Sequence, residues 1–349
     1  MAGRTSPVTA RAAVFDGPGL PFRIVERPLP RRLEAGAVLV EVSLATVCGS
    51  DLHTHAGRRQ GPVPAVLGHE GVGHVVAAGA GREPWLGRRV TWSLADSCGR
   101  CPACTAWALP QKCAQLFKYG HAPLQEGDGL HGTYATHVVL RAGTHLVEVP
   151  PHLSDAVAAP ANCAVATMVH LTEQLPASVS LAVVQGAGLL GLLGCALLRA
   201  AGVPRVLVVD VDEARQATVA RFGGEAVRSE ALPTQCADLV IEAAGVPEVV
   251  PEGVRLLRPG GHYLLAGMVH PASALALTGE ALIRGCVTLR GFHNYAPPHL
   301  DGAVAFLRDS TLPWDTLVSA PLPLSAIDEA FALAGTRRWA RVAVAPGLP

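Results

Sequence analysis

The most constraining feature of this sequence is a glycine-rich stretch, LAVVQGAGLLGLLGCALLRAAG, which begins at Leu181. A short apolar run is followed by Gly186, Gly188 and Gly191 in the spacing G-x-G-x-x-G, and then by an apolar pattern of helical period. The next apolar run, RVLVVD, ends at Asp210, about twenty residues after the glycines. A strand, a glycine turn, a helix and a second strand that ends in a carboxylate predict a parallel βαβ unit that binds a dinucleotide.

The same residues predict which dinucleotide is bound. The glycines would place the pyrophosphate at the helix N-terminus, where free N–H groups and the helix dipole favour an anion. Asp210 would accept hydrogen bonds from the two hydroxyls of the adenosine ribose, and its charge would repel a 2′-phosphate. The following Val211 and Asp212 offer no arginine for such a phosphate, so the sequence favours NAD over NADP.

Further apolar runs continue the alternation of strands and helices: ADLVIEAAGV, GGHYLLAGM and VTLRGF. This alternation predicts an α/β fold with a doubly wound parallel sheet. It also assigns the uncharged segment 179–198, whose length alone would fit a membrane span, to one buried strand and one buried helix. Cys195, Cys236 and Cys286 fall in this half of the chain and are predicted to be core thiols.

Length and charge limit the other possibilities. At 349 residues the chain is long enough for two domains. The formal net charge is zero and 16% of the residues are charged, so neither nucleic acid nor a membrane surface is an expected partner. The first residues contain no apolar run of signal-peptide length, which predicts a cytoplasmic protein.

Four of the nine cysteines lie in the segment 98–113, CGRCPACTAWALPQKC. In a reducing compartment this spacing favours a metal over disulfides. Glycine and proline interrupt the segment, so it is predicted to be a loop rather than a redox pair within a βαβ unit. Four thiolates suit a closed, tetrahedral and structural Zn²⁺ site. The predicted ligands are Cys98, Cys101, Cys104 and Cys113.

Three further candidate ligands are scattered: Cys48 in VCGSDLHTH, His69 in LGHEGVGHV and Cys163 in APANCAVAT. Two thiolates and one imidazole would leave one position of Zn²⁺ open for water or a substrate oxygen, as a catalytic site requires. Taken singly, the cysteines could be small buried apolar residues and the histidine a turn residue. Their polar neighbours favour the metal site.

These neighbours have predicted roles of their own. Asp51 would orient the histidine ligand, as metal-bound imidazoles nearly always require. Glu70 would be a carboxylate close to the metal or an occasional extra ligand. Ser50 and His53 would carry a proton from an alcohol to solvent, because a hydroxyl both donates and accepts and a histidine titrates near neutrality.

As a set, CGSDLH, GHEGVGHV, the four-cysteine segment, NCAVAT and GAGLLG resemble the zinc-dependent alcohol dehydrogenases of the medium-chain dehydrogenase/reductase superfamily. The resemblance covers nearly the whole chain and implies a mainly β GroES-like catalytic domain, formed by residues 1–160 and 299–349. A Rossmann NAD-binding domain would occupy residues 161–298. The resemblance also implies one catalytic and one structural Zn²⁺ per chain, and a homodimer or homotetramer.

The resemblance assigns further residues. The three scattered ligands would hold the catalytic zinc, and Ser50 with His53 would form the proton relay. Thr167 would contact the nicotinamide end of NAD, and Arg341 would contact the pyrophosphate unless it is a surface residue. The four-cysteine segment departs from the family because the spacing before its last cysteine is one residue longer than usual, which leaves the geometry of that ligand open.

The function implied is reversible oxidation of an alcohol to an aldehyde or ketone with hydride transfer to NAD. The segments LPQKCAQLFKYGH and GFHNYAPPHLDGAVAFL also resemble a bacterial subgroup associated with phosphonate metabolism. The residues that would then bind the phosphonate of the substrate are Lys118, His121, His293 and Asn294.

Other functions remain open at this point. The two segments could instead be a loop beside the zinc and a packing motif, in which case the enzyme would be a simple, secondary or polyol alcohol dehydrogenase. A zinc-free quinone or enoyl reductase is disfavoured, because such enzymes lack the catalytic ligand set. A non-catalytic nucleotide-binding protein on the same fold is the alternative outside enzymes.

Overall fold

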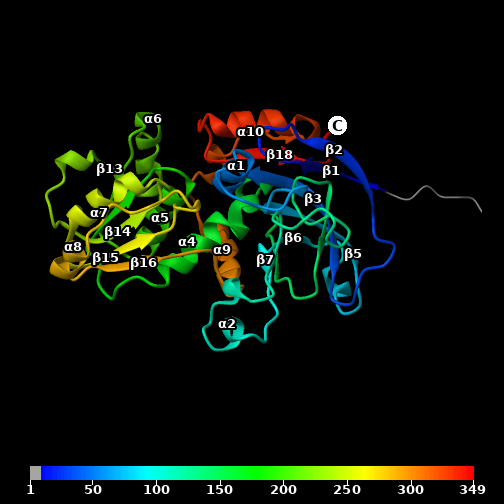
Figure 1. Cartoon of the computed structure of the whole chain (residues 1–349), viewed down its shortest axis with the longest axis horizontal. Helices are drawn as coiled ribbons and strands as arrows, with labels where there is room; N and C mark the ends of the chain where they lie inside the picture. The colour runs from blue at the N-terminus through cyan, green and yellow to red at the C-terminus, as the bar shows by residue number, and fades with distance from the viewer. Residues whose placement is uncertain (1–8) are drawn as a thin grey trace, which may run out of the picture. The chain divides into compact units, whose positions relative to one another are not determined.

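The computed structural model describes residues 9–349, which form two compact units (Figure 1). Unit 1 comprises the chain up to Cys163 together with Ala296–Ser310 and Trp314–Pro349, and unit 2 comprises Ala164–Tyr295 and Thr311–Pro313. The main junctions, after Cys163 and before Ala296, each lie three residues from the boundaries predicted at 160/161 and 298/299.

Unit 1 is mainly β. Its strands are β1 Thr9–Phe15, β2 Arg23–Pro28, β3 Val38–Val47, β4 Ala65–Val66, β5 Glu70–Ala78, β6 Arg89–Trp92, β7 Ala95–Asp96, β8 Phe117–Lys118, β9 His137–Leu140, β10 Leu146–Glu148, β17 Leu322–Pro323 and β18 Val342–Ala345. The largest sheet has the order β10-β6-β5-β3-β18-β17, with β9 also paired to β3. Because β18 pairs antiparallel with β3, the C-terminal segment completes the N-terminal sheet, as the GroES-like resemblance implies.

The helices of unit 1 are short, apart from two near the C-terminus. They are α1 Gly49–His55, α2 Pro102–Thr105, α3 Asp155–Ala158, α9 Pro298–Asp309 and α10 Ile327–Gly335, with 3₁₀ turns η1 Glu83–Trp85, η2 Pro110–Lys112, η3 Ala159–Asn162, η7 Trp314–Leu317 and η8 Leu324–Ala326. The cysteine segment, predicted to be a loop, contains α2 and η2. Pro102 and Pro110 stand at the first positions of these turns, where proline favours helical backbone.

Unit 2 is a parallel α/β sheet, which confirms the predicted fold class. The strands are β11 Leu181–Gln185, β12 Arg205–Val209, β13 Glu225–Ala226, β14 Ala237–Glu242, β15 Leu257–Leu265 and β16 Thr288–Gly291. The helices are α4 Ala164–Thr172, α5 Leu189–Ala200, α6 Glu213–Gln216, α7 Val250–Leu256 and α8 Gly279–Gly285, with 3₁₀ turns η4 Val219–Phe222, η5 Ser229–Ala231 and η6 Pro247–Val249. The strand order is β13-β12-β11-β14-β15-β16, so the strands that follow β11 are first added on one side of it and then, from β14, on the other. Ligands bind at such switch points in α/β sheets.

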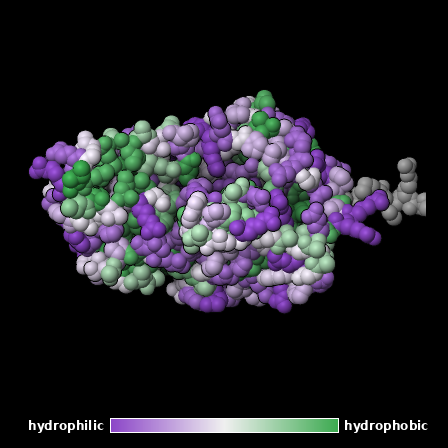
Figure 2. Space-filling view, turned by 60° about the horizontal axis from the view of Figure 1, so that its bottom comes forward, coloured by the Kyte–Doolittle hydropathy of each residue, from purple (hydrophilic) through white to green (hydrophobic). Residues whose placement is uncertain are grey.

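The uncharged segment 179–198 forms β11 and most of α5 within unit 2. Among residues 9–349, no helix combines the length and the apolar character that crossing a membrane would need. Unit 2 does expose some apolar side chains, including Val211, which follows β12, and Ile283, which lies on α8. Figure 2 shows green, apolar surface on the part of the molecule that this unit forms. Cys286, at the end of α8, is exposed, so its prediction as a core thiol was wrong; Cys195 is buried.

Candidate metal and cofactor sites

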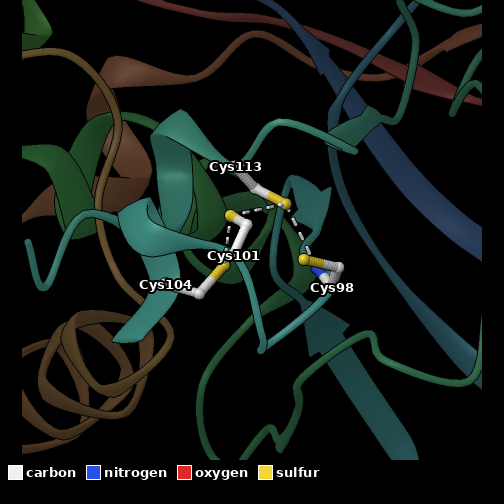
Figure 3. A group of neighbouring side chains, drawn as sticks. All are labelled: Cys98, Cys101, Cys104 and Cys113. Atoms are coloured by element: carbon white, nitrogen blue, oxygen red, sulfur yellow. Dashed lines mark hydrogen bonds between the residues drawn. The ribbon is translucent and has the colours of Figure 1, made fainter. Parts of the chain in front are cut away.

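The four cysteines of the segment 98–113 gather in unit 1, with their sulfur atoms turned toward one another (Figure 3). Cys101 Sγ lies 3.6 Å from Cys104 Sγ and 3.8 Å from Cys113 Sγ. These distances exceed the disulfide bond length of about 2.05 Å. They match the edge, about 3.8 Å, of a tetrahedron whose Zn–S bonds are about 2.3 Å long. The cluster therefore fits a Zn²⁺ ion, and the longer spacing before Cys113 does not remove that ligand from it.

Backbone N–H groups prepare this cluster for a cation. The N–H groups of Cys98 and Gln115 donate to Cys113 Sγ at 3.3 Å. Backbone donors, first that of Ala114, lower the pKa of Cys101 to about 6 in the metal-free protein. Burial, and then its hydrogen bond with Cys101, raise the pKa of Cys104 to about 11. The cluster thus already holds thiolate before a metal binds.

Cys48, His69 and Cys163 form a second cluster in unit 1, although they are far apart in sequence. Their ligand atoms and one carboxylate oxygen of Glu70 all lie within 4.8 Å of one another. The register of the sheet explains this, because β3 and β5 pair antiparallel with Thr46 opposite Glu70, which brings the end of β3 beside the start of β5. Thiolates and an imidazole are the donors that zinc prefers, so this set also fits Zn²⁺.

Two side chains fix the elements that carry these ligands. Asn162, at the end of η3, donates from Nδ2 to the backbone oxygens of His69 and Trp92, both at 2.9 Å. Cys48 precedes α1, and its N–H donates to Asp51 Oδ2 at 3.1 Å, which closes the first turn of that helix. The three ligands are therefore held by secondary structure and buried polar contacts.

Asp51 is the centre of a buried network beside His69. Its Oδ2 also accepts a hydrogen bond from the Tyr134 hydroxyl at 2.9 Å. Its Oδ1 lies 3.4 Å from His69 Nδ1, which is longer than an ordinary hydrogen bond. Burial lowers the pKa of His69, but Asp51 and then Cys48 outweigh it and raise the pKa to about 10 in the metal-free protein. Asp51 is thus placed to orient the imidazole.

Glu70 is held by an ion pair rather than left free. Its Oε2 accepts from Arg341 Nε and from Thr46 Oγ1, both at 2.6 Å, and its Oε1 accepts from Arg341 Nη2 at 2.8 Å. Arg341 Nη2 also lies 3.6 Å from Cys48 Sγ. The pyrophosphate contact of Arg341 stays a prediction; in the structure this buried guanidinium contacts Glu70 and Cys48 of the cluster and the Ala340 carbonyl.

The two thiols of this cluster share one proton. A hydrogen bond from Cys163 and, against the effect of burial, the charge of Arg341 hold the pKa of Cys48 well below its usual value. The same hydrogen bond, together with burial, raises the pKa of Cys163. Cys48 is therefore the thiolate of the pair in the metal-free protein.

Ser50 and His53 lie three residues apart on α1, and this spacing places them on the same side of a helix. Both side chains are partly exposed. His53 Nδ1 accepts a hydrogen bond from Arg58 Nε at 3.0 Å, so the neutral ring carries its hydrogen on Nε2. No role was predicted for Arg58 from the sequence.

Lys118 and His121 belong to a turn that packs on the backbone next to His69. A Cβ atom added to Gly120 would lie 2.2 Å from the carbonyl oxygen of Gly68, so the backbones of these two segments are in contact with no side chain between them. The rings of His121 and His69 are 5.2 Å apart. Burial, and then the charge of Arg59, lower the pKa of Lys118 to about 8.

His121 is a neutral group in this arrangement. Burial, and then the charge of Lys118, hold its pKa well below the ordinary histidine value. His293 is exposed and Asn294 is half-buried, and both follow β16 in unit 2. Lys118 and His121 are thus placed near the metal cluster, while the other two predicted substrate residues belong to the other unit.

The glycine turn of unit 2 has room for a phosphate group. Gly186 has a φ of +104°, and a Cβ on Gly191 would lie 1.8 Å from the Gly186 carbonyl oxygen, so both positions require glycine. Gly188 is the residue before α5, and nothing lies within 4 Å of the place where its Cβ would be. This open face at a helix N-terminus fits the pyrophosphate of a dinucleotide.

Asp210 directly follows β12 and faces the glycine turn. Its Oδ2 accepts from the Ala187 N–H at 2.6 Å, and its Oδ1 accepts from the Asp212 N–H at 2.9 Å. Arg215 approaches Oδ2 to 3.9 Å, a neighbour that the sequence did not indicate. Thr167, predicted to contact the nicotinamide, lies half-buried on α4.

Comparison with known proteins decides the family. The model of the alcohol dehydrogenase GroES-like domain matches residues 34–151, and that of the zinc-binding dehydrogenase matches residues 190–309. D-xylulose reductase A of Aspergillus oryzae is 31% identical over 311 residues, which cover 80% of this chain and 83% of that protein. The chain belongs to the zinc-binding alcohol dehydrogenase family.

Solved structures of similar proteins agree with this assignment. An alcohol dehydrogenase of Thermotoga maritima shares 28% identity with a TM-score of 0.90, covering 97% of this chain and 99% of that one. A protein of Sinorhizobium meliloti described as a zinc-binding dehydrogenase, bound to NADP, shares 25% identity with a TM-score of 0.85, covering 97% of this chain and all of that one. This alcohol dehydrogenase family member is therefore an oxidoreductase of small-molecule alcohols.

The sequence did not indicate several residues of the site. Tyr134, Asn162 and Thr46 act through contacts with residues distant in the chain; Asn162 lies in the quoted segment NCAVAT, but no role was predicted for it, and no quoted motif contains Tyr134 or Thr46. Arg59 follows the recognisable CGSDLHTH segment closely, but the pair Arg58 and Arg59 after a short helix has no distinctive spacing.

Proposed function

We propose that this protein is an NAD-dependent, zinc-dependent alcohol dehydrogenase that interconverts an alcohol and an aldehyde or ketone. The gathering of Cys48, His69 and Cys163 around a single point in unit 1 carries the proposal. A non-catalytic nucleotide-binding protein would not need these donors together with a histidine-orienting aspartate. The relative D-xylulose reductase A is named for the reduction of a ketone-bearing sugar, which gives a secondary alcohol, and this supports a secondary alcohol as one substrate type.

Bound zinc would supply a Lewis acid that makes the alcohol more acidic, and bound NAD would accept a hydride. The three ligands would hold the metal, and Asp51 would keep the His69 ring in place through Nδ1. Glu70, neutralised by Arg341, would place a carboxylate close to the metal without adding net charge.

Ser50 and His53 would carry the hydroxyl proton toward solvent. The Arg58 contact with His53 Nδ1 has to open when the ring takes up a proton, because an imidazolium has no acceptor. Arg58 is exposed, so this movement needs no change in the core. The helix α1 therefore provides both the proton path and, through Asp51, the support of a metal ligand.

NAD, rather than NADP, is the proposed cofactor because Asp210 stands where a 2′-phosphate would lie. One relative of known structure is bound to NADP, and Arg215 lies near Asp210, so the two cofactors are compared directly. We expect the wild-type protein to have a lower KM for NAD than for NADP. Asp210→Ser should raise the KM for NAD about tenfold and lower that for NADP, since the substitution removes the acceptor for the ribose hydroxyls and the charge that repels a 2′-phosphate.

The decisive experiment follows NADH absorbance with zinc-loaded protein and a panel of alcohols that includes xylitol, 1-butanol and 2-hydroxyethylphosphonate. Oxidation of any of them with NAD, and its loss in Cys163→Ser, would support the proposal. Binding of NAD without turnover of any alcohol would favour the non-catalytic alternative. The comparisons give no support to the resemblance to a phosphonate-associated subgroup, so the phosphonate is included as a test of substrate class.

A further inference from the structure

Two cations near the metal cluster lack a directly contacting partner for their charged groups among residues 9–349. Neither the Lys118 ammonium nor the Arg59 guanidinium makes a hydrogen bond or ion pair with any of the residues 9–349. Most other basic side chains of unit 1 do, such as Arg89 with Asp155 and Arg341 with Glu70. A half-buried charge without a counter-charge is unfavourable, so these two cations call for an anion from outside the chain.

The position of these cations relates them to the metal cluster. Lys118 begins the turn that packs on Gly68, immediately before His69. The Lys118 ammonium also interacts electrostatically with Arg59 and with the thiols of Cys163 and Cys48. Both cations are therefore close to the ligands that would hold the metal.

The charges of the cluster leave room for an anion. Two thiolates would neutralise a bound Zn²⁺, and Arg341 neutralises Glu70. Asp51 then contributes one negative charge, against the two positive charges of Lys118 and Arg59. At least one positive charge remains for the ligand.

From these observations we propose that the substrate is an alcohol that carries an anionic group, and that Lys118 and Arg59 bind this group beside the metal. The proposal rests on the proposed dehydrogenase function. The anion is a carboxylate, a phosphate or a phosphonate, since all three accept charge-assisted hydrogen bonds from these side chains. His121, neutral and next to Lys118, offers a further polar contact.

The test compares anionic and neutral alcohols of similar length on zinc-loaded protein with NAD. 4-Hydroxybutanoate and 2-hydroxyethylphosphonate are the anionic arms and separate the carboxylate from the phosphonate; 1,4-butanediol and xylitol are the neutral arms. We expect kcat/KM to be roughly ten- to a hundredfold higher for at least one anionic alcohol. Lys118→Met should remove most of this preference by raising the KM for that substrate much more than the KM for the neutral alcohols.

Controls separate the loss of charge from a structural defect. Lys118→Arg keeps the charge and should keep the preference, and Arg59→Gln should weaken it. Arg32→Gln removes an exposed arginine of the same unit, outside this cluster, and should change nothing. Equal efficiency for anionic and neutral alcohols, or equal damage to both in Lys118→Met, would overturn the proposal.

Calorimetry gives a readout that does not depend on turnover. Titration of 2-hydroxyethylphosphonate and of 4-hydroxybutanoate into the protein should show binding that weakens about tenfold or more in Lys118→Met. If no alcohol is oxidised but this binding is present, the dehydrogenase proposal fails while the anion site stands. If alcohols are oxidised and neither anion binds, the anion site is wrong and the dehydrogenase proposal stands.

Discussion

The two metal clusters of unit 1 are built in opposite ways. The four-cysteine cluster comes from one continuous segment of the chain, three of its residues are half-buried, and backbone N–H groups are its main support. The Cys48 cluster comes from three distant segments and is supported by buried side chains, among them Asp51, Tyr134 and Asn162. A local cluster can stabilise its own segment, whereas a distributed cluster depends on the fold and is kept for chemistry.

The largest difference should appear when one ligand of the distributed cluster is removed. Cys163→Ser is expected to lower kcat/KM by roughly a thousandfold or more, because the metal provides several kcal/mol of transition-state stabilisation. Metal analysis should find one zinc per chain instead of two, with the thermal midpoint little changed. Cys286→Ser, which changes an exposed thiol, is the matched control. A variant that kept both zinc ions and its activity would contradict the assignment.

Acidification should also separate the clusters. His69, with a pKa of about 10, and Cys163, whose pKa is raised, both hold protons that zinc must displace, so the apparent zinc affinity falls as pH falls. Displacement of two protons changes the apparent zinc affinity by about a hundredfold per pH unit. In the other cluster, donors lower the pKa of Cys98 and Cys101, while that of Cys104 is raised to about 11; one ligand with a raised pKa, instead of two, then opposes zinc, so this cluster should keep zinc to lower pH. Loss of the structural zinc first, in a chelator titration at several pH values, would contradict this order.

Removing a ligand of the local cluster should affect stability more than chemistry. Cys104→Ser is expected to cost a few kcal/mol and to lower the thermal midpoint by roughly 5–10 °C, because zinc binding is folding energy for its segment. The activity per folded molecule at low temperature should stay within about threefold of wild type, in line with the neutral effect of mutations far from the chemistry. Calorimetry and zinc analysis would measure both quantities. An unchanged midpoint would mean that the segment does not need its metal.

The smallest expected effect concerns the Tyr134 hydroxyl. Tyr134→Phe removes one hydrogen bond to Asp51, and contacts of this kind change metal affinity by about ten- to a hundredfold. We expect the lower end of that range, measured by chelator competition at the catalytic site, with the structural site unchanged. Tyr263→Phe removes another buried tyrosine hydroxyl, one that donates to Gln185 in unit 2, and should leave zinc affinity unaltered. If both variants changed zinc affinity equally, the Tyr134 contact would have no specific role in metal binding.

The two clusters also differ in how far the sequence predicted them. The spacing of the cysteines alone was enough to predict the local cluster, because ligands close in sequence are necessarily close in space. The ligands of the distributed cluster were predicted from their neighbours and from a family resemblance. Tyr134, Thr46 and the Arg341–Glu70 pair could not be predicted, because they depend on how β3, β5 and β18 pair in the sheet.

The Rossmann sheet of unit 2 was predictable to the level of individual strands. Each of its predicted apolar runs overlaps an observed strand and Asp210 follows β12 directly, whereas the short strand β13 was not predicted. Periodicity and glycine spacing are local signals, so they survive without knowledge of tertiary contacts. Arg215 was missed because its approach to Asp210 depends on how the chain turns into α6.

The contact between Gly120 and Gly68 has a consequence for how this enzyme could diversify. A side chain at Gly120 would collide with the Gly68 backbone, so Gly120 cannot change without moving the turn or the segment that carries His69; a side chain at Gly68 would collide with Thr133. The side chains at 118 and 121 are attached to the same turn, but they contribute no ligand to the metal. With the proposed anion site, natural or laboratory evolution could exchange these two residues to change the accepted substrate without removing a candidate metal ligand.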